Sequence, residues 1–410
     1  MSRHKVPALL IWALGTTQII GYGTLYYSFS ILAPETATDF SLPLDWLFGL
    51  LSAALLAGGL LAPQAGKWAD RLGAGRLMVP GSVVAALSLA CAAVSSHPAT
   101  FAASLVVMEL SACFVLYSTA FAAIVQLGGA NAQRSITHLT LIAGFASTLF
   151  WPLTSMLHER FDWREIYLIF ALLNLLVCLP IHWWIGKFPR EAEAASHPAI
   201  AESAPSGAAI APLNGRQNLF LLMLAGFAVE GFVLASLLVH MVPLLGALGV
   251  GTSALMVSAL FGPSQVASRL INMICGGRLS QTLLATISAA LLALALAVLL
   301  AAGTWLPGLA LFAILFGFGS GLASIVGGTL PLELFGKAGY GARLGWVTAA
   351  RQFSSALAPF VFALVLASIG PEHAVTVTIF GAFIAVALFG AIAVLQHRRP
   401  VLSPEVPTGS

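Results

Sequence analysis

The chain has 410 residues, of which 59% are hydrophobic and only 8% are charged. Soluble domains carry about a quarter charged residues, so this composition excludes a soluble globular protein and indicates one embedded in a membrane. The net charge of +3 is small and reflects membrane topology, so no binding to nucleic acid is indicated.

Twelve apolar runs are long enough to cross a bilayer, which takes a helix of about 20 residues. They cover residues 7–33, 45–66, 77–95, 99–126, 136–157, 164–187, 217–245, 252–275, 279–302, 307–334, 345–369 and 373–396. We therefore predict an all-α integral membrane protein with twelve transmembrane helices in two six-helix halves.

The placement of lysine and arginine predicts the orientation, because cytoplasmic loops carry an excess of both. With the N-terminus in the cytoplasm, 14 of the 18 basic residues fall in cytoplasmic segments: Arg3, Lys5, Lys67, Arg71, Arg76, Arg134, Lys187, Arg190, Arg216, Arg278, Lys337, Arg343, Arg398 and Arg399. Arg160 and Arg164 fall in outer loops, and Arg269 and Arg351 lie inside spans. We expect both termini in the cytoplasm, a multi-pass protein of the cell inner membrane, and no cleavable signal peptide.

A polar segment separates the two halves. Residues 186–217 include EAEAASHPAIAESAPSGAAIAP, which is rich in Ala, Pro, Ser and Glu and has no apolar face to bury. Such a composition is typical of a flexible linker. We predict a first half over 1–187, a cytoplasmic linker over 188–216, a second half over 217–397 and a cytoplasmic tail over 398–410.

The halves look like repeats of one another. Pro34 and Pro243 are 209 positions apart, and so are Arg134 and Arg343. Matches at nearly one shift favour a duplication over chance. Transporters built from such parallel repeats bind their substrate between the halves near mid-membrane.

The sequence after the second predicted span reads GKWADRLGAGRLM. It resembles the signature G-x-x-x-D-R-x-G-x-x-R of the major facilitator superfamily, matched at Gly66, Asp70, Arg71, Gly73 and Arg76. With twelve spans and a central linker, the resemblance covers the whole chain and implies a secondary transporter. It also implies that this loop latches the two halves on the cytoplasmic side, with Asp70 and Arg71 as gating residues. Glycines there permit a tight reversal, and a carboxylate can sit against a helix N-terminus.

The corresponding place in the second half reads GGRLSQ. Ser280 and Gln281 stand there in the positions of Asp70 and Arg71, so the charges of the signature are missing. We predict that the second latch is degenerate.

Arg269 stands within the eighth span, in the stretch FGPSQVASRLINM. An arginine at mid-bilayer costs about 2.5–3.5 kcal/mol on insertion scales, so it usually faces a wet cavity or a partner. The region resembles spans 7–8 of monocarboxylate transporters and oxalate–formate-type antiporters, with His240, Val242 and Pro243 in register. That resemblance implies that Arg269 holds the substrate carboxylate, with Gln265 where those carriers tend to have an acid. The alternative is a structural ion pair between two helices.

Three further ionisable residues lie within spans. Arg351 is either a second ligand of the anion or a residue whose long side chain reaches the membrane surface. Glu230 and Glu109 are candidates for proton coupling, because a carboxyl group in an apolar site can carry a proton at neutral pH. Each could instead neutralise one of the two arginines. Cys113 and Tyr117 follow Glu109 at i+4 and i+8, which predicts a polar stripe on one helix face.

The first span contributes TTQIIGYGTLYYSF. Gln18 and Tyr22 are one turn apart near mid-membrane, where an amide and a hydroxyl would complete an otherwise apolar pocket, so we expect both to line the substrate site. Tyr26 and Tyr27 belong either to that pocket or to the outer aromatic belt.

No cofactor or metal site is expected. Four cysteines fall in spans, where we expect small buried apolar side chains without a disulfide framework or metal-ligand spacing: Cys91, Cys113, Cys178 and Cys275. No P-loop occurs in a cytoplasmic segment, so nothing indicates ATP as the energy source.

These observations predict a monomeric secondary transporter that moves a small organic anion such as a monocarboxylate, with proton coupling as a hypothesis. Its partners would be the solute, protons and the lipid bilayer. Efflux of a drug or of a toxic solute such as arsenite is the alternative within transport, although GFASTLFWPL in the fifth span lacks the pattern of drug–proton antiporters. A transporter-like solute sensor is the alternative from another class, and no catalytic constellation supports an enzyme.

Overall fold

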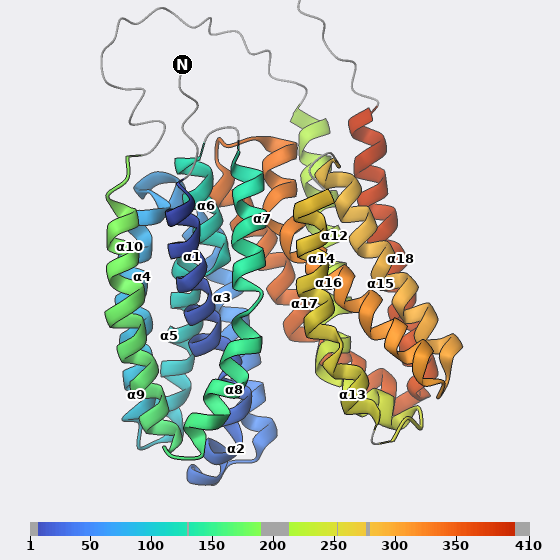
Figure 1. The fold of residues 1–410 in the computed structure, drawn as a ribbon, viewed down its shortest axis with the longest axis horizontal. Coiled ribbons are helices and arrows are strands. Elements are labelled where there is room, and N and C mark those ends of the chain that lie inside the picture. The colour runs from blue at the N-terminus through green and yellow to red at the C-terminus, as the bar shows by residue number, and fades with distance from the viewer. Residues whose placement is uncertain (1–6, 129–130, 190–212, 252, 276–278, 398–410) are drawn as a thin grey trace, which may run out of the picture.

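The computed structural model describes residues 7–128, 131–189, 213–251, 253–275 and 279–397 (Figure 1). The predicted tail 398–410 lies outside these residues, and so does most of the predicted linker 188–216. The domain boundaries therefore stay a prediction.

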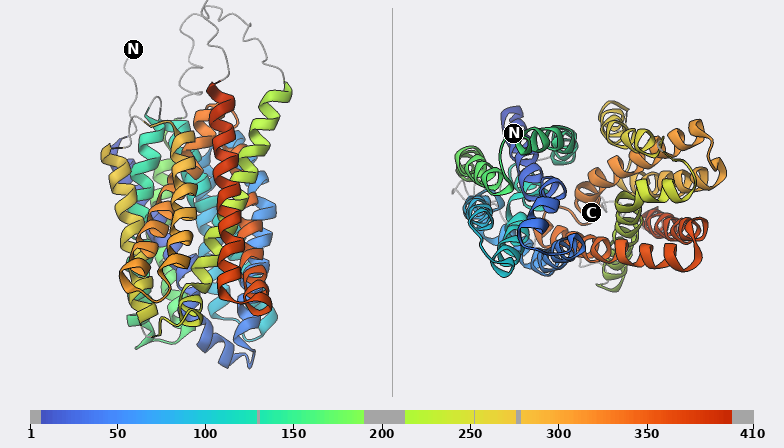
Figure 2. Two further views of the ribbon diagram at one scale, coloured as in Figure 1. Left: turned by 90° about the vertical axis from the view of Figure 1, so that its right-hand side faces the viewer. Right: turned by 90° about the horizontal axis from the view of Figure 1, so that it is seen from below.

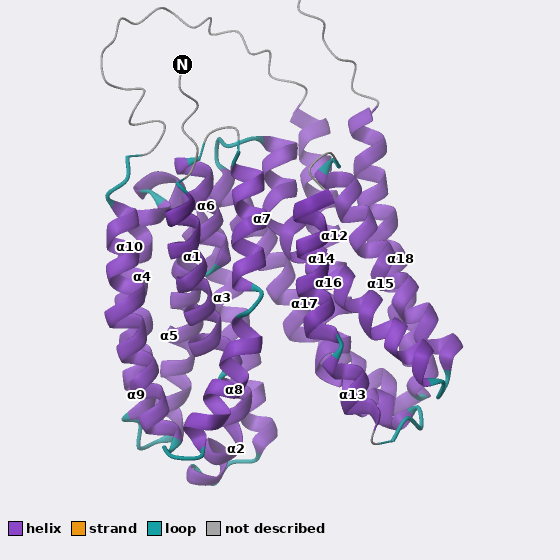
Figure 3. Ribbon diagram, viewed as in Figure 1, coloured by secondary structure: helices purple, strands orange, loops and turns teal. Residues whose placement is uncertain are grey.

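Every regular element in the described part of the chain is a helix (Figure 3). Twelve helical stretches are long and apolar enough to cross a membrane: Ala8–Asp39, Leu44–Leu72, Ala74–Ala93, Pro98–Leu127, Ala132–His158, Trp163–Gly186, Gln217–Ala247, Ser253–Cys275, Gln281–Ala302, Leu306–Phe335, Tyr340–Ile369 and Pro371–Gln396. The all-α fold and the number of spans are confirmed, and most ends agree with the prediction within a few residues.

The first six spans are formed by α1 (Ala8–Tyr22), the π-helical segment η1 (Gly23–Tyr27), α2 (Phe29–Asp39), α3 (Leu44–Leu72), α4 (Ala74–Ala93), α5 (Pro98–Val115), α6 (Tyr117–Leu127), α7 (Ala132–Ala143), α8 (Ala146–His158), α9 (Trp163–Leu173), the π-helical segment η2 (Asn174–Cys178) and α10 (Leu179–Gly186). The last six are formed by α12 (Leu213–Ala247), α13 (Ser253–Ala259), α14 (Phe261–Cys275), α15 (Gln281–Ala302), α16 (Leu306–Phe335), α17 (Tyr340–Ile369) and α18 (Pro371–His397).

The second span is longer than predicted. α3 ends at Leu72, so Asp70 and Arg71 stand on its last turn and not in a loop, and that part of the prediction was wrong. The helix continues because its apolar face stays packed as far as Ala69, which is 1% exposed. The chain reverses at Gly73, whose φ of 96° is accessible to glycine without strain.

The fourth span is broken at Leu116, between α5 and α6. Leu116 is extended (φ −89°, ψ −165°), and neither glycine nor proline marks the position. The polar stripe predicted from Glu109 through Cys113 to Tyr117 is therefore interrupted, because Tyr117 begins a new helix.

The helices form two groups, α1–α10 and α12–α18, which lie side by side when seen along the spans (Figure 2). Corresponding spans begin at nearly one shift, since Pro98 and Leu306 are 208 positions apart and so are Ala132 and Tyr340. This spacing agrees with the duplication inferred from the sequence. The groups converge at the end where α3 meets α4, here called the Asp70 end, and diverge towards the opposite end (Figure 1).

At the Asp70 end the two groups meet along α3 and α17, in a contact called here the α3–α17 seam. A Cβ added at Gly66 would lie 2.1 Å from the carbonyl oxygen of Gly341. One added at Gly345 would lie 2.3 Å from the carbonyl oxygen of Ala62. Small residues thus let the two backbones approach closely, as they do between other membrane helices.

Two cysteines depart from their expected burial. Cys113 and Cys178 are buried, whereas Cys91 and Cys275 are exposed, so the expectation was wrong for the latter two. The reason is that lipid tails are as apolar as a protein core, so an apolar residue in a span need not face the interior.

Candidate functional site

Arg269 lies on α14 at the contact between the two groups of helices, and only 4% of it is exposed. Its Nε donates a hydrogen bond to Ser324 Oγ at 3.1 Å, on α16 of the same half. Its Nη1 donates to the main-chain carbonyl of Thr140 at 3.1 Å, on α7 of the other half. The guanidinium therefore bridges the halves, a contact that sequence reasoning missed because it ends on a backbone oxygen.

No carboxylate pairs with Arg269 among the described residues. The alternative reading, a structural ion pair, thus finds no partner in that part of the chain. Moving an ion out of water costs about several kcal/mol, and an opposite charge offsets that cost best. The neutral acceptors around Arg269 leave its positive charge without such an offset. The site is therefore suited to an anion that completes it.

Gln265, one turn before Arg269, links α14 to α16 by a side-chain hydrogen bond. Its Nε2 donates to Ser320 Oγ at 2.8 Å. The two helices lie so close here that a Cβ on Gly321 would be 2.0 Å from Ser268 Oγ. Gln265 is half-buried beside Arg269, and its amide is already engaged in part.

Arg351, on α17, extends towards α16 of the same half. A Cβ on Gly327 of α16 would lie 2.8 Å from Arg351 Nη1, so the guanidinium rests against the middle of that helix. Its charge acts on Glu230 within the same half and on Tyr22 across the contact. Arg269 thus reaches the first half, whereas the guanidinium of Arg351 lies against α16 of its own half.

Two carboxyl groups are buried deep in the spans. Glu230 is 1% exposed; its Oε1 accepts a hydrogen bond from Ser288 Oγ at 2.8 Å, and its Oε2 has no hydrogen-bond partner among the described residues. Glu109 is 4% exposed on α5, and its carboxyl group forms no hydrogen bond or ion pair in the described part of the chain. Within the described residues, neither carboxyl forms an ion pair with an arginine.

The first half contributes a cluster of three aromatic rings, those of Tyr22, Tyr27 and Tyr117, called here the tyrosine face. The centroids of Tyr22 and Tyr117 are 4.8 Å apart, and those of Tyr22 and Tyr27 are 6.3 Å apart. Arg269 acts electrostatically on Tyr27 and Tyr117. Tyr26, 43% exposed, packs edge-on against Tyr27, and the choice between pocket and aromatic belt stays a prediction for both.

Gln18 supports this face from behind. It is 0% exposed, and its Nε2 donates to the carbonyl of Val115 at 2.8 Å. Val115 is the last residue of α5, next to the break at Leu116, so the amide satisfies a carbonyl that the break releases. This bond makes Gln18 a positioning residue for Tyr117.

The latch residue Asp70 caps the N-terminus of α17. Its Oδ1 accepts a hydrogen bond from the N–H of Gly341 and its Oδ2 one from the N–H of Ala342, both at 2.8 Å. A carboxylate does sit against a helix N-terminus, as expected, and that helix belongs to the other half. Arg71 follows on the same turn and Arg76 opens α4.

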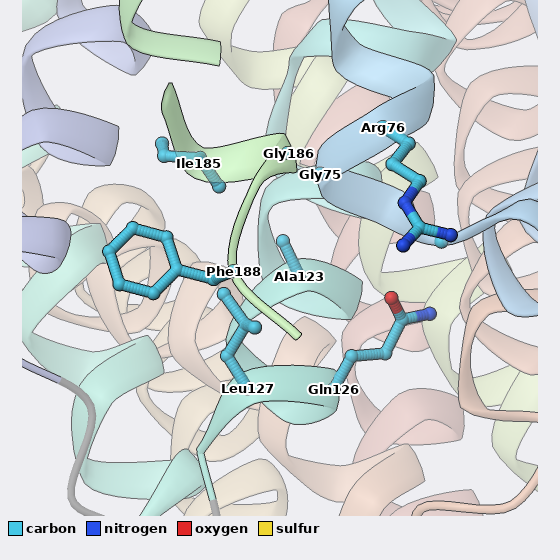
Figure 4. A pocket seen from close by; sticks show the side chains of 9 residues that line it. Gly75, Arg76, Ala123, Gln126, Leu127, Ile185, Gly186 and Phe188 are labelled. Atoms are coloured by element: carbon cyan, nitrogen blue, oxygen red, sulfur yellow. The ribbon is translucent and has the colours of Figure 1, made fainter. Parts of the chain in front are cut away.

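Gln126 joins α3 to α4 on the side of Arg76 and was not singled out from the sequence (Figure 4). Its Oε1 accepts from the N–H of Ala74 at 2.8 Å, and its Nε2 donates to the carbonyl of Ala69 at 2.9 Å. It lines a small pocket that also contains Arg76, Ala123 and Phe188. The pocket holds about 10 Å³, room for about one water molecule, and is too small for a solute.

In the second half, the hydrogen bonds that the described residues show for Ser280 and Gln281 stay within that half. Ser280 caps α15 by accepting from the N–H of Leu283 at 3.2 Å. Glu333 Oε2, on α16, accepts from the N–H of Gln281 at 2.7 Å. Gly276, Gly277 and Arg278 lie outside the described residues.

His240 is held on α12 at the end opposite Asp70. Its Nδ1 is 3.1 Å from the carbonyl of Ser236, and its ring centroid is 5.0 Å from that of Phe362. Val242 is partly exposed on the same helix, and Pro243 stands inside it. In the described part of the chain, no hydrogen bond joins any of the three to Arg269.

Comparison with known proteins identifies the fold. The sequence profile described as Major Facilitator Superfamily matches residues 12–284. No curated protein sequence matches the chain.

Three solved structures are similar over nearly the whole chain. The human organic anion transporter MFSD10 (TETRAN) has a TM-score of 0.71 at 19% identity, covering 94% of this chain and 100% of that chain. FucP in the outward conformation has a TM-score of 0.64 at 13% identity, covering 93% and 98%. The proton:xylose symporter XylE bound to 6-bromo-6-deoxy-D-glucose has a TM-score of 0.65 at 15% identity, covering 96% of each chain. At these identities the likeness concerns the fold alone.

Proposed function

Because the chain belongs to the major facilitator superfamily, whose members are transporters and not enzymes, we propose that it is a secondary transporter of a small organic anion. A monocarboxylate is the first candidate. The spans 1–6 and 7–12 would rock about a site between them, as in other transporters with parallel repeats.

One observation carries the proposal: Arg269 is buried at the contact between the halves and, among the described residues, donates only to neutral acceptors. A guanidinium in that setting binds a carboxylate through two parallel hydrogen bonds, which a lysine imitates poorly. Arg351 adds a second positive charge nearby. The fold is shared by carriers of anions and of sugars, so the preference for an anion is supported by the positive charge of Arg269 and Arg351.

Coupling to protons is proposed through Glu230. Its carboxyl is buried with a single donor, and Arg351 is near enough to act on it without pairing. A proton could therefore bind at Oε2 when the arginine turns to the anion. We expect Glu230→Gln to abolish accumulation driven by a pH gradient and to leave anion exchange intact. Accumulation that persists in the variant would rule Glu230 out, and Glu109→Gln would then be tested in the same way.

Gating is proposed at the Asp70 end. Asp70 holds the N-terminus of α17 through two hydrogen bonds, and the α3–α17 seam runs beside it. Release of the latch would let the halves part there and close at the other end. With the Asp70 end in the cytoplasm of a bacterial-type inner membrane, the present arrangement is the outward-facing state of a monomer.

Binding tests the proposal before transport is measured. Purified wild type, Arg269→Gln and Arg269→Lys are heated with lactate, succinate, arsenite or tetraphenylphosphonium. A ligand at 100 times its Kd stabilises by about 2.7 kcal/mol, which is readily detected. We expect stabilisation by a carboxylate in wild type, none in Arg269→Gln and weak stabilisation in Arg269→Lys.

The matched control is Arg160→Gln, which removes an exposed arginine at the opposite end and should bind like wild type. Stabilisation by arsenite or by the cation that survives Arg269→Gln would contradict the proposal and favour efflux of a toxic solute.

A further inference from the structure

We propose that the transported anion is an aromatic carboxylate, whose ring packs on the tyrosine face while its carboxylate pairs with Arg269. This inference rests on the proposed function and names the substrate class of the same site. It depends on which polar and aromatic side chains each half places at the contact between the halves.

The two halves present different chemistry to one another. The second half supplies two guanidinium groups, on Arg269 and Arg351. The first half supplies aromatic rings with hydroxyl groups, on Tyr22, Tyr27 and Tyr117, and Arg269 reaches across to that half through its hydrogen bond to the carbonyl of Thr140. A ligand between the halves therefore meets positive charge on one side and aromatic surface on the other.

The spacing of the rings suits a further ring. The ring centroid of Tyr117 is 4.8 Å from that of Tyr22 and 4.9 Å from that of Phe121, on which it is stacked. Tyr27 continues the row to Trp151, at 5.9 Å. Aromatic rings prefer centroid distances of about 4.5–7 Å, so the row already has the geometry that a planar ligand would extend. The three rings of the tyrosine face are half-buried and keep part of their surface open.

The backbone is irregular at the places that set these rings. In the π-helical segment η1, the N–H of Ser28 bonds the carbonyl of Gly23 at 3.0 Å, five residues back. That wider turn brings Tyr22 and Tyr27, also five residues apart, towards one face, whereas an α-helix would point them about 140° apart. Such π-helical turns inside α-helices occur frequently at functional sites.

The second irregularity is the break at Leu116, which starts α6 at Tyr117. The break has no glycine or proline to explain it, and Gln18 stabilises it from the first span. Two independent departures from regular helix thus position the same set of rings. A small aliphatic acid would use the arginines and leave this surface unused.

The test compares ligands that differ from benzoate in the ring or in the charge. Dissociation constants for benzoate, cyclohexanecarboxylate, acetate and benzamide are measured by calorimetry on the full chain. Benzoate and cyclohexanecarboxylate have the same charge and similar size, but only benzoate has a π face. We expect benzoate to bind about 3- to 10-fold more tightly than cyclohexanecarboxylate, from the aromatic contact alone, and benzamide not to bind.

The variants assign the preference to the tyrosine face. Tyr117→Leu should bring the ratio of the two constants to about 1, and Tyr117→Phe should keep it, because the ring and not the hydroxyl makes the contact. If Tyr117→Leu does not unfold cooperatively, Tyr27→Leu takes its place.

The outcomes separate this inference from the proposed function. Benzoate that binds no more tightly than cyclohexanecarboxylate or acetate, with all of them lost in Arg269→Gln, would overturn the aromatic inference and leave an anion carrier. Binding of none of the carboxylates to wild type would overturn both.

Discussion

Removing the carboxylate of Asp70 should shift the equilibrium between the latched and parted states, by an amount that follows from its two hydrogen bonds. Asp70→Ala removes two bonds of 2.8 Å from a carboxylate to the first N–H groups of α17. A hydrogen bond to a charged group contributes about 1.5–3 kcal/mol, and we take the lower value for each because Asp70 is only half-buried. The total of about 3 kcal/mol would shift the balance between the latched and parted states by about 100-fold.

Distances between spin labels measure that balance. Labels at Leu72 and Ala338, both exposed and on opposite halves, report the separation of the Asp70 end. The exposed thiols Cys91 and Cys275 must first be replaced, because they would also be labelled. We expect one short distance in the parent protein and a large added population at longer distance in Asp70→Ala.

The control for that experiment is Asp45→Ala, which removes an exposed carboxylate in the first turn of α3, at the opposite end. It should leave the distances unchanged. An unchanged distribution in Asp70→Ala would refute the reasoning, because the two hydrogen bonds would then not hold the halves together.

Three further substitutions test other contacts. Gly345→Ala places a Cβ 2.3 Å from the carbonyl oxygen of Ala62, so it should open the α3–α17 seam in the same label assay, whereas Gly49→Ala, with nothing within 4 Å, should not. Gln126→Leu removes two hydrogen bonds and should lower thermal stability by about 2 kcal/mol; a loss below 0.5 kcal/mol would argue against its role in joining α3 to α4. Tyr340→Phe deprives a buried main-chain carbonyl of its 2.6 Å partner and should cost about 1–3 kcal/mol in the same unfolding assay, which an unchanged melting curve would contradict.

Most of the fold could be predicted from the sequence because a bilayer imposes a simple rule. Every backbone polar group in the membrane must be satisfied within its own segment, so each long apolar run becomes a helix. The rule is weakest at the ends: α3 runs to Leu72 because buried small residues such as Ala69 extend its packed face beyond the apolar run. Hydropathy alone does not detect that packing.

From the sequence, the site could be predicted only at ionisable residues that lie within a membrane span. Arg269 and Glu230 stand out because ionisable groups in a span are costly. Their neighbours do not stand out in the sequence. Thr140 contacts Arg269 through its main-chain carbonyl, and Gly327 contributes only the absence of a side chain beside Arg351. The break at Leu116 also escaped prediction, because tertiary packing and not a local signal produces it.

Transport by Arg269 variants tests the central claim most directly. Counterflow of radiolabelled carboxylate, with the anion identified by the binding screen, is measured in proteoliposomes containing wild type, Arg269→Gln or Arg160→Gln. The account predicts exchange in wild type and Arg160→Gln and at least a 100-fold loss in Arg269→Gln, about 3 kcal/mol for a buried charge left without its partner. Exchange at the wild-type rate in Arg269→Gln would contradict the claim that this guanidinium binds the transported anion.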